Sequence, residues 1–345
     1  MFEPALCRRD LLAGTCALAA SLALAACDGG TGPKGASGEP ARGSAFAFDT
    51  YCTFTVYGDD GAISKLSEAC GRYDGLFDLY DDASDIARIN AAGGGPVGVD
   101  PETVELVSRA LGFCEQADGL FDITIGAVST LWDFDRGVRP ADEAIAAALP
   151  HVGWRGVEVD ERASTVRLTD PKAKIDLGGI AKGFVADRLC DLLRDETDAE
   201  AAVISLGGNI AFFGTKPGGG AWDAGIRDPN DPGGDKTVGT AHVKGGSLVT
   251  SGLYERTFEK DGTAYWHILD PRTGMPVETD IVSDTVACPS STEADALSTT
   301  LFVAGSRKGA AIADAHEGTG AYFLLQDGKS SESSRWAELA SFDEG

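Results

Sequence analysis

Apolar residues recur at helical spacing in several parts of the chain. Residues 62–80 carry an apolar or aromatic side chain at every third or fourth position, which predicts a helix. The residues of this stripe are Ile63, Leu66, Cys70, Tyr73, Phe77 and Tyr80. A second helix is predicted from Asp100, a capping residue, with Pro101 in its first turn. The segment "AIAAALPHVGW" predicts a third, short helix that ends at Pro150.

Strand patterns are interspersed with these helices. Alternating runs at residues 157–160 and 164–170 predict a hairpin, and a helix is expected over about residues 179–194. Further strands are predicted in "AAVISLGG", in "WDAGIRDP" and on both sides of "KDGTAYWHILD". Two helices, "EADALSTTLFVAG" and "RKGAAIADAH", come before a last strand, "AYFLLQ". Because the strands and helices show no regular βαβ alternation, the pattern predicts an α+β fold.

The N-terminal segment has the pattern of an export signal. Arg8 and Arg9 precede an apolar run over residues 11–26, which predicts a signal peptide over residues 1–26 and is too short to predict a transmembrane helix. The sequence "LAAC" at its end is similar to the lipobox of bacterial lipoproteins, in which Cys27 would carry the lipid. An ordinary signal peptide followed by a stray cysteine is the alternative.

The region after Cys27 is rich in glycine and proline up to residue 45, which predicts a lipidated cysteine and flexible tether over residues 27–45. A globular domain would then occupy residues 46–345. Such a chain would be an exported lipoprotein, anchored on the outer face of the cytoplasmic membrane.

The net charge of the chain is −25 at pH 7. An acidic body of this kind repels nucleic acid, so no nucleic-acid partner is expected. An anionic substrate would need a local cation, either a metal ion or a few basic side chains. The cysteines beyond Cys27 are scattered and show neither zinc-ligand nor redox-pair spacing.

The segment "KIDLGGIAKGFVADRL", residues 174–189, is a candidate anion site. Asp176 precedes Gly178 and Gly179 at a predicted helix start, where exposed backbone N–H groups and the helix dipole favour an anion. Lys182 would add a full positive charge. The alternative is a glycine-rich turn that lets a helix pack close to a strand.

The segment "EADALSTTLF" is a candidate metal site. Asp295 and Thr299 are four residues apart, so they share one face of the predicted helix. A carboxylate and a hydroxyl are hard oxygen ligands that suit Mg²⁺ or Ca²⁺ and suit Zn²⁺ poorly. The alternative is an aspartate that complements the helix dipole and a threonine that bonds back to a carbonyl.

Two further segments contain candidate polar groups. His267 lies in "YWHILDPRTGMP", on a strand that enters a turn at Pro271, and is either a buried structural histidine or a group that moves a proton. The preceding "TSGLYER" brings Arg256 nearby. In "SLGGNIAFFG", Asn209 follows two glycines and could bond a ligand, although a strand bulge explains the glycines equally well.

Together, "DLGGIAKGF", "SLGGNI", "TSGLYER", "HILDPRTGMP" and "ADALSTTLF" resemble motifs of the ApbE family, the FAD:protein FMN transferases. The segments "LYDDASDIARIN" and "GLFDITIGAVSTLWDF" are similar to N-terminal motifs of that family, and the resemblance runs from about residue 46 to residue 326. The departures are the loosened "YDDAS" and Cys288 in "VACPSS". Neither departure touches a proposed metal ligand.

The resemblance implies a T-fold-like core of mainly antiparallel strands with added helices. It also implies Mg²⁺ as cofactor and FAD as substrate, with transfer of the FMN moiety to a Ser or Thr hydroxyl of a target protein and release of AMP. The acceptor would be an exported or membrane-bound redox protein with a Ser/Thr flavinylation motif. An FAD pyrophosphatase and a non-catalytic flavin-binding lipoprotein are the alternatives.

The resemblance also implies roles for individual residues. Asp295, Thr299 and the backbone carbonyl of Gly179 would hold the metal, and His267 would be the base, because the ordinary pKa of histidine suits proton transfer near neutral pH. The residues expected to contact FAD are Tyr80, Leu120, Phe121, Asp122, Asp176, Lys182 and Ile268.

Overall fold

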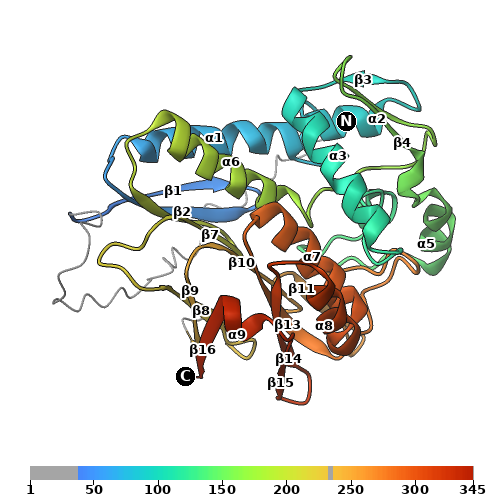
Figure 1. Cartoon of the computed structure of the whole chain (residues 1–345). Coiled ribbons are helices and arrows are strands. Elements are labelled where there is room, and N and C mark those ends of the chain that lie inside the picture. The colour runs from blue at the N-terminus through green and yellow to red at the C-terminus, as the bar shows by residue number, and fades with distance from the viewer. Residues whose placement is uncertain (1–37, 232–235, 345) are drawn as a thin grey trace.

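An eight-stranded sheet forms the centre of the computed structural model, which describes residues 38–231 and 236–344 (Figure 1). Every pair of neighbouring strands in this sheet is antiparallel. In order across the sheet, the strands are β1 (Ala41–Ala47), β2 (Thr50–Tyr57), β6 (Ala201–Leu206), β7 (Asn209–Gly214), β10 (Gly246–Gly252), β13 (Ile281–Cys288), β14 (Gly320–Leu325) and β15 (Ser330–Glu332).

Helices cover one face of this sheet. They are α1 (Ala62–Phe77), α6 (Ala181–Glu196), α7 (Ser291–Ala304) and α8 (Ser306–Ala315). The almost continuously apolar sequence of β6 is explained by its burial on both faces. Ile204 and Leu206 face the helices, whereas Ala201 and Val203 belong to a second apolar cluster on the opposite face. A strand that is buried on both faces cannot alternate apolar with polar residues.

A smaller sheet packs on the opposite face. Its strands are β8 (Trp222–Arg227), β9 (Thr237–Val243) and β16 (Ala340–Glu344), and the short helix α9 (Trp336–Leu339) lies beside them. Trp222 and Trp336 are almost completely buried in the cluster between the two sheets. The large aromatic side chains therefore fix the smaller sheet to the central one.

The segment between α1 and α6 forms a separate lobe, at the upper right of Figure 1. Its elements are α2 (Asp85–Ala91), β3 (Val97–Gly98), α3 (Pro101–Gln116), α4 (Gly126–Ser129), α5 (Asp142–Ala148), the 3₁₀ turns η2 (Leu149–His151) and η3 (Trp154–Gly156), β4 (Val157–Asp160) and β5 (Thr165–Leu168). The β3, β4 and β5 strands form a three-stranded antiparallel sheet.

A third apolar cluster joins this lobe to the hairpin of β11 (Thr257–Lys260) and β12 (Thr263–Trp266). Trp132 and Val128 belong to the cluster, and the Trp132 indole N–H donates to the carbonyl of Gly274 at 3.3 Å. Gly274 has a φ of +69°, and a Cβ there would lie 2.9 Å from Val128. Only glycine fits this turn, which places "HILDPRTG" against the lobe.

The α+β class with a core of mainly antiparallel strands and added helices is confirmed. The helix at residue 100 is confirmed in detail, because the Asp100 carboxylate accepts a hydrogen bond from Glu102 N at 2.9 Å and Pro101 is the first residue of α3. The predicted hairpin at residues 157–170 is confirmed as β4 and β5.

Two details of the predicted elements are wrong, namely the end of the first helix and the identity of the last strand. The first predicted helix ends at Phe77 and not at Tyr80, because the Asp78 carboxylate accepts from Tyr80 N at 2.8 Å and stabilises a turn instead. The strand in "AYFLLQ" is β14, and it is not the last strand, since β15 and β16 follow it.

The expected boundary between tether and domain, after residue 45, falls inside β1. This strand begins at Ala41 and pairs with β2 along its whole length. Gly43 lies against Ile63 of α1, where a Cβ would collide with the isoleucine side chain. A glycine that the composition assigns to the tether is therefore a packing residue. The predicted signal peptide and Cys27 lie outside the described residues.

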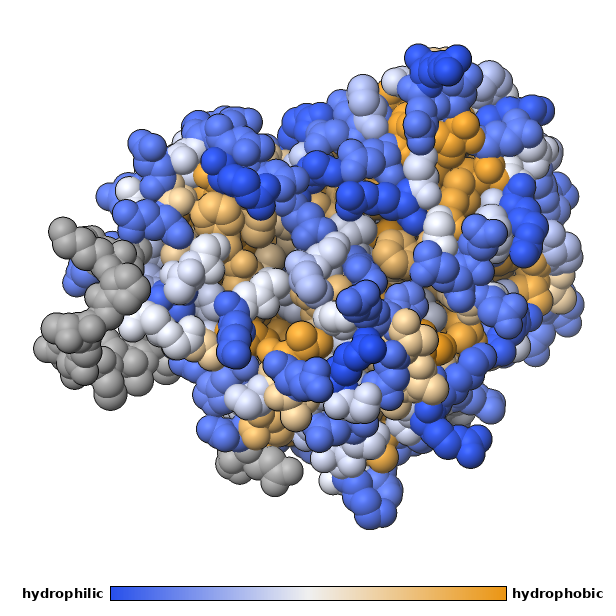
Figure 2. Space-filling view, viewed as in Figure 1, coloured by the Kyte–Doolittle hydropathy of each residue, from blue (hydrophilic) through white to orange (hydrophobic). Residues whose placement is uncertain are grey.

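Ionisable and apolar residues are distributed as expected for an acidic globular chain. Figure 2 shows mostly hydrophilic residues on the displayed face, with apolar residues in separate patches.

Among the residues that the structure describes, no helix is both long and apolar enough to cross a bilayer. The cysteines of that same part, Cys52, Cys70, Cys114, Cys190 and Cys288, are free thiols.

One buried carboxyl group gives a testable prediction about stability. Asp284 on β13 is 0% exposed, and burial raises its pKa well above the ordinary value of 3.8, although the backbone N–H groups of Ser251 and Asp284 oppose the rise. The folded state therefore binds a proton that the unfolded state releases as pH rises. Stability should fall with pH by about 1.4 kcal/mol per unit between the two pKa values.

Asp284→Asn should remove this loss, because the amide carries no charge. We expect the free energy of unfolding of the variant to exceed that of the wild type by a margin that grows from pH 4 to pH 7. Denaturant titrations of both proteins across this range measure the margin. A constant difference at every pH would contradict the prediction.

Candidate active site

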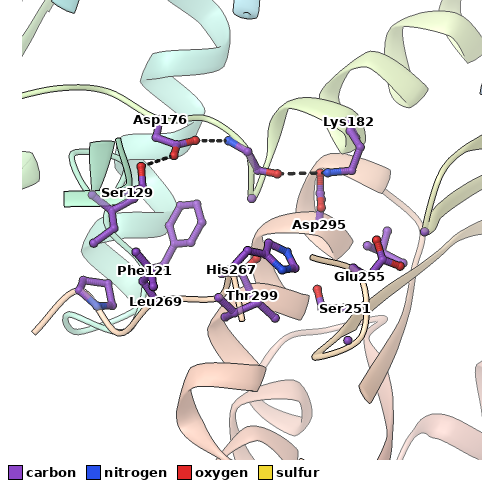
Figure 3. Close-up of a pocket in the computed structure, with 18 of the residues that line it drawn as sticks. Phe121, Ser129, Asp176, Lys182, Ser251, Glu255, His267, Leu269, Asp295 and Thr299 are labelled. Carbon is purple, nitrogen blue, oxygen red and sulfur yellow. Dashed lines mark hydrogen bonds between the residues drawn. The ribbon is translucent and has the colours of Figure 1, made fainter. Parts of the chain in front are cut away.

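A pocket lies where the N-terminal end of α6, strand β10, helix α7 and the loop after β12 converge (Figure 3). Most of the residues predicted from the sequence line it. These are Leu120, Phe121, Asp122, Asp176, Gly179, Lys182, His267, Ile268, Asp295 and Thr299. Among the described residues, Tyr80 does not line this pocket. It is 52% exposed and lies beyond the end of α1.

The pocket has chemically different sides. Figure 3 shows Phe121 and Leu269 on one side and Ser251 and Glu255 on the other, with His267 between them. The first side offers apolar surface. The second side offers hydroxyl and carboxylate oxygens.

A group of oxygen atoms suited to binding a metal lies at the contact between α7 and the start of α6. These atoms belong to Asp295, Thr299 and Gly179. Asp295 is 4% exposed and its Oδ2 accepts from Gly183 N at 2.8 Å. A Cβ on Gly179 would lie 2.9 Å from Thr299 Oγ1, so the Gly179 backbone is directly against the threonine. Two segments more than a hundred residues apart thus bring these three residues together.

This donor set fits a magnesium ion. A carboxylate, a hydroxyl and a backbone carbonyl are hard oxygen ligands, and Mg²⁺ commonly uses few protein ligands because substrate phosphates and waters supply the rest. Burial raises the pKa of Asp295, and the charge of Lys182 opposes that rise. A desolvated carboxyl of this kind is stabilised as an anion by a cation beside it. In residues 38–231 and 236–344, no three His, Cys, Asp or Glu side chains form a conventional metal cluster.

The start of α6 differs from the predicted anion cradle. The helix begins at Ala181, and the N–H groups of Ile180 and Ala181 donate to the carbonyl of Leu177. Gly178 N donates to Asp176 at 2.9 Å, and Gly183 N is taken by Asp295. Several of the expected backbone donors therefore already have partners inside the protein.

Lys182 can still contact an anion, because among the described residues its Nζ donates only to the neutral carbonyl of Gly178, at 3.1 Å, and an ammonium group has three donors (Figure 3). Asp176 has a supporting role, since its Oδ2 accepts from Ser129 Oγ at 2.6 Å and so links the lobe to the turn before α6. Asp122 similarly accepts from Thr124 Oγ1 at 2.6 Å and from Trp154 N at 3.1 Å.

His267 lines the centre of the pocket. Its backbone N donates to the carbonyl of Arg256 at 3.1 Å, its ring Nδ1 is buried and has no hydrogen-bond partner among the described residues, and the residue as a whole is partly exposed. Burial, together with the smaller effects of the charges of Arg256 and Lys182, lowers the pKa of His267 to about 4. This direction is opposite to that expected for a histidine that titrates near neutral pH, and the ring is neutral at pH 7.

Some lining residues were not predicted. Glu255, Ser251 and Ser129 line the pocket, and Glu255 and Ser251 come from the same "TSGLYER" segment from which Arg256 was expected to contribute. Arg256 instead forms an ion pair with Asp49 at 3.1 Å. The polar residues of that segment were the available signal, but a strand pattern alone does not say which of them faces a pocket.

Asn209 is not a lining residue of the described pocket. It is completely buried, and its Oδ1 accepts from Ser291 Oγ at 2.6 Å at the start of α7. The neighbouring Gly208 does line the pocket, and a Cβ there would lie 2.6 Å from the carbonyl of Thr250. The bulge interpretation is wrong, because Leu206 pairs directly with Asn209 and the two glycines form the two-residue turn between β6 and β7, with Gly207 at a φ of +68°.

Comparisons with known proteins agree with this geometry. The ApbE family model matches residues 48–323. A FAD:protein FMN transferase of Treponema pallidum (strain Nichols) is 40% identical over 300 residues, covering 81% of this chain and 82% of the relative. The crystal structure of the ApbE protein from Thermotoga maritima has a TM-score of 0.80 and 32% identity over 87% of this chain and 99% of that one. The flavin transferase ApbE from Vibrio cholerae has a TM-score of 0.75 and 26% identity, over 87% and 99% of the two chains.

Proposed function

Since the chain belongs to the ApbE family, we propose that it is a FAD:protein FMN transferase. The observation that carries the proposal is the convergence of Asp295, Thr299 and Gly179 with Lys182 and His267 in one pocket. In this reaction a Ser or Thr hydroxyl oxygen of the acceptor attacks the FMN phosphorus. The pyrophosphate P–O bond breaks, AMP leaves with the bridging oxygen, and a base takes the hydroxyl proton.

Each group of the pocket has a distinct part in this reaction. Phosphoryl transfer depends mainly on alignment and on neutralisation of charge. A divalent cation held by Asp295, Thr299 and Gly179 would supply most of that neutralisation at the pyrophosphate. Lys182 adds a positive charge within an otherwise acidic chain. Phe121 and Leu269 provide apolar surface for the flavin or the adenine ring.

His267 is proposed as the base. A neutral imidazole has one unprotonated nitrogen that can accept the hydroxyl proton, and its low pKa keeps it in this form at neutral pH. Asp176 and Asp122 act mainly by fixing the turns that surround the ligand. Tyr80 would contact FAD only where the ligand extends beyond the pocket.

One incubation tests the proposal against its alternatives. The protein is mixed with FAD, Mg²⁺ and a candidate exported or membrane-bound redox protein, and the products are separated. Flavin bound covalently to a Ser or Thr of the acceptor supports the transferase. Free FMN with AMP indicates a pyrophosphatase, and intact FAD indicates a flavin-binding protein.

The proposed location follows from the N-terminal sequence. We propose that the protein is exported and anchored through a lipid on Cys27, where "LAAC" is similar to a lipobox. Cys27→Ser should move the protein from the membrane fraction to the soluble or unprocessed fraction and abolish incorporation of labelled palmitate. Cys16→Ser, inside the predicted signal peptide, is the control and should leave both unchanged. Membrane association of the Cys27 variant at the wild-type level would refute the anchor.

A further inference from the structure

Helices α6 and α7 cap each other. The first N–H groups of any helix lack a partner within the helix. At the start of α6, Gly183 N donates to Asp295 Oδ2 of α7 at 2.8 Å. At the start of α7, Ser291 N and Thr292 N donate to the carboxylate of Asp187 in α6, at 2.8 and 2.9 Å. Each helix thus supplies a carboxylate to the N-terminal end of the other.

Asp187 makes more contacts with α7 than a single cap requires. Its Oδ2 also accepts from Ser290 Oγ at 2.9 Å and from Thr292 Oγ1 at 2.6 Å. Two backbone and two side-chain donors of the first turn of α7 therefore converge on one carboxylate. Asp187 is not a lining residue of the described pocket.

The helices touch without a side chain between them. A Cβ on Gly183 would collide with the carbonyl of Ser291 and would lie 2.7 Å from the Cβ of Asp295. Gly183 and Asp187 are one turn apart on α6, and Asp295 and Ser291 are one turn apart, in the opposite order, on α7. A sliding or rotation of α7 along α6 would break both sets of hydrogen bonds at once.

We propose that Asp187 is a positioning residue for the metal site. It holds the start of α7 against α6, and this contact sets where Asp295 and Thr299 stand relative to Gly179. The inference rests on the proposed function, because it assumes that these three residues hold a divalent cation. Asp187 acts through Asp295 and Thr299 and does not touch the substrate.

The test is direct measurement of Mg²⁺ affinity in Asp187→Asn. The amide keeps the size of the side chain but replaces one accepting oxygen with a donor that faces the N–H groups of α7. Isothermal titration of Mg²⁺ into the full-length protein with saturating FAD should show affinity weakened about 10-fold, the lower end of the loss for an outer partner of metal ligands. The maximal rate at saturating Mg²⁺ should stay within about threefold of the wild type, because the ligands themselves are unchanged.

A matched control lies one turn further along α6. Asp191 pairs with Arg188 and Arg194 of its own helix, so Asp191→Asn should bind Mg²⁺ as the wild type does. Thr292→Val removes one hydroxyl donor from Asp187 and keeps the carboxylate, and it should weaken Mg²⁺ binding by a smaller factor. This second variant decides the question if Asp187→Asn does not fold.

Unchanged Mg²⁺ affinity in the Asp187 and Thr292 variants, or an equal loss in the Asp191 control, would overturn the inference. The outcome is separate from that of the proposed function. Weaker Mg²⁺ binding without any FMN transfer by the wild type would leave the positioning role intact and would refute the activity. FMN transfer with a Mg²⁺ affinity independent of Asp187 would do the reverse.

Discussion

Asp295→Ala is expected to abolish Mg²⁺-dependent FMN transfer, with a loss of about 1,000-fold, the upper end of the effect that follows removal of one electrostatic group from an active site. The change removes the carboxylate of the proposed metal site. It should not unfold the protein, because the variant also loses a buried acid whose pKa burial has raised. Rates at increasing Mg²⁺ and thermal melts measure both effects.

Glu293→Ala is the matched control for Asp295→Ala. Glu293 lies in the first turn of the same helix, pairs with His316 and does not line the described pocket. If Asp295 merely complemented the dipole of α7, both variants would lose about 0.3–1 kcal/mol of stability and keep their activity. Asp295→Ala with near wild-type turnover, or wild-type turnover that a chelator does not affect, would exclude the metal site.

His267→Ala is expected to slow FMN transfer by about 10²–10⁴-fold, the usual contribution of a general base, and to leave FAD affinity nearly unchanged. His151→Ala is the control, because His151 pairs with Asp170 away from the described pocket and its loss should not alter the rate. Single-turnover transfer and fluorescence titration of FAD separate the two quantities. Transfer by His267→Ala at the wild-type rate would show that another group takes the proton.

The low pKa of His267 makes the expected pH dependence specific. The neutral base is present well above pH 4, so His267 should cause no decrease in rate between pH 8 and pH 6, and the rate should fall as pH approaches about 4.

The same histidine should affect stability. In the unfolded chain it binds a proton with a pKa near the ordinary value of 6.5, whereas in the folded chain it stays neutral at that pH. Stability from this group is therefore complete above pH 6.5 and is lost as pH falls, and His267→Ala should remove that loss.

Local patterns in the sequence were sufficient for much of the fold and for the residue types of the site. Helical spacing and the Asp100–Pro101 pair predict α3, because capping and periodicity depend on neighbouring residues. The four-residue spacing of Asp295 and Thr299 places both on one face of α7, and both line the pocket. The order of the motifs was enough to identify the family, which the comparisons confirm.

Other features depend on contacts between residues that are far apart in the chain. The composition around Gly43 predicts a tether, but in the folded chain Gly43 packs against Ile63 of α1. His267 has a depressed pKa because the fold buries it, and no property of "YWHILDP" specifies that burial. Hydrogen bonds from Gly183 to Asp295 and from Ser291 to Asp187 join segments separated by 112 and 104 positions. The amino-acid sequence specifies which chemical groups are present and how they are spaced locally. Their protonation, their partners and their mutual position depend on the folded chain, because desolvation and hydrogen bonding are set by what lies around a group in space.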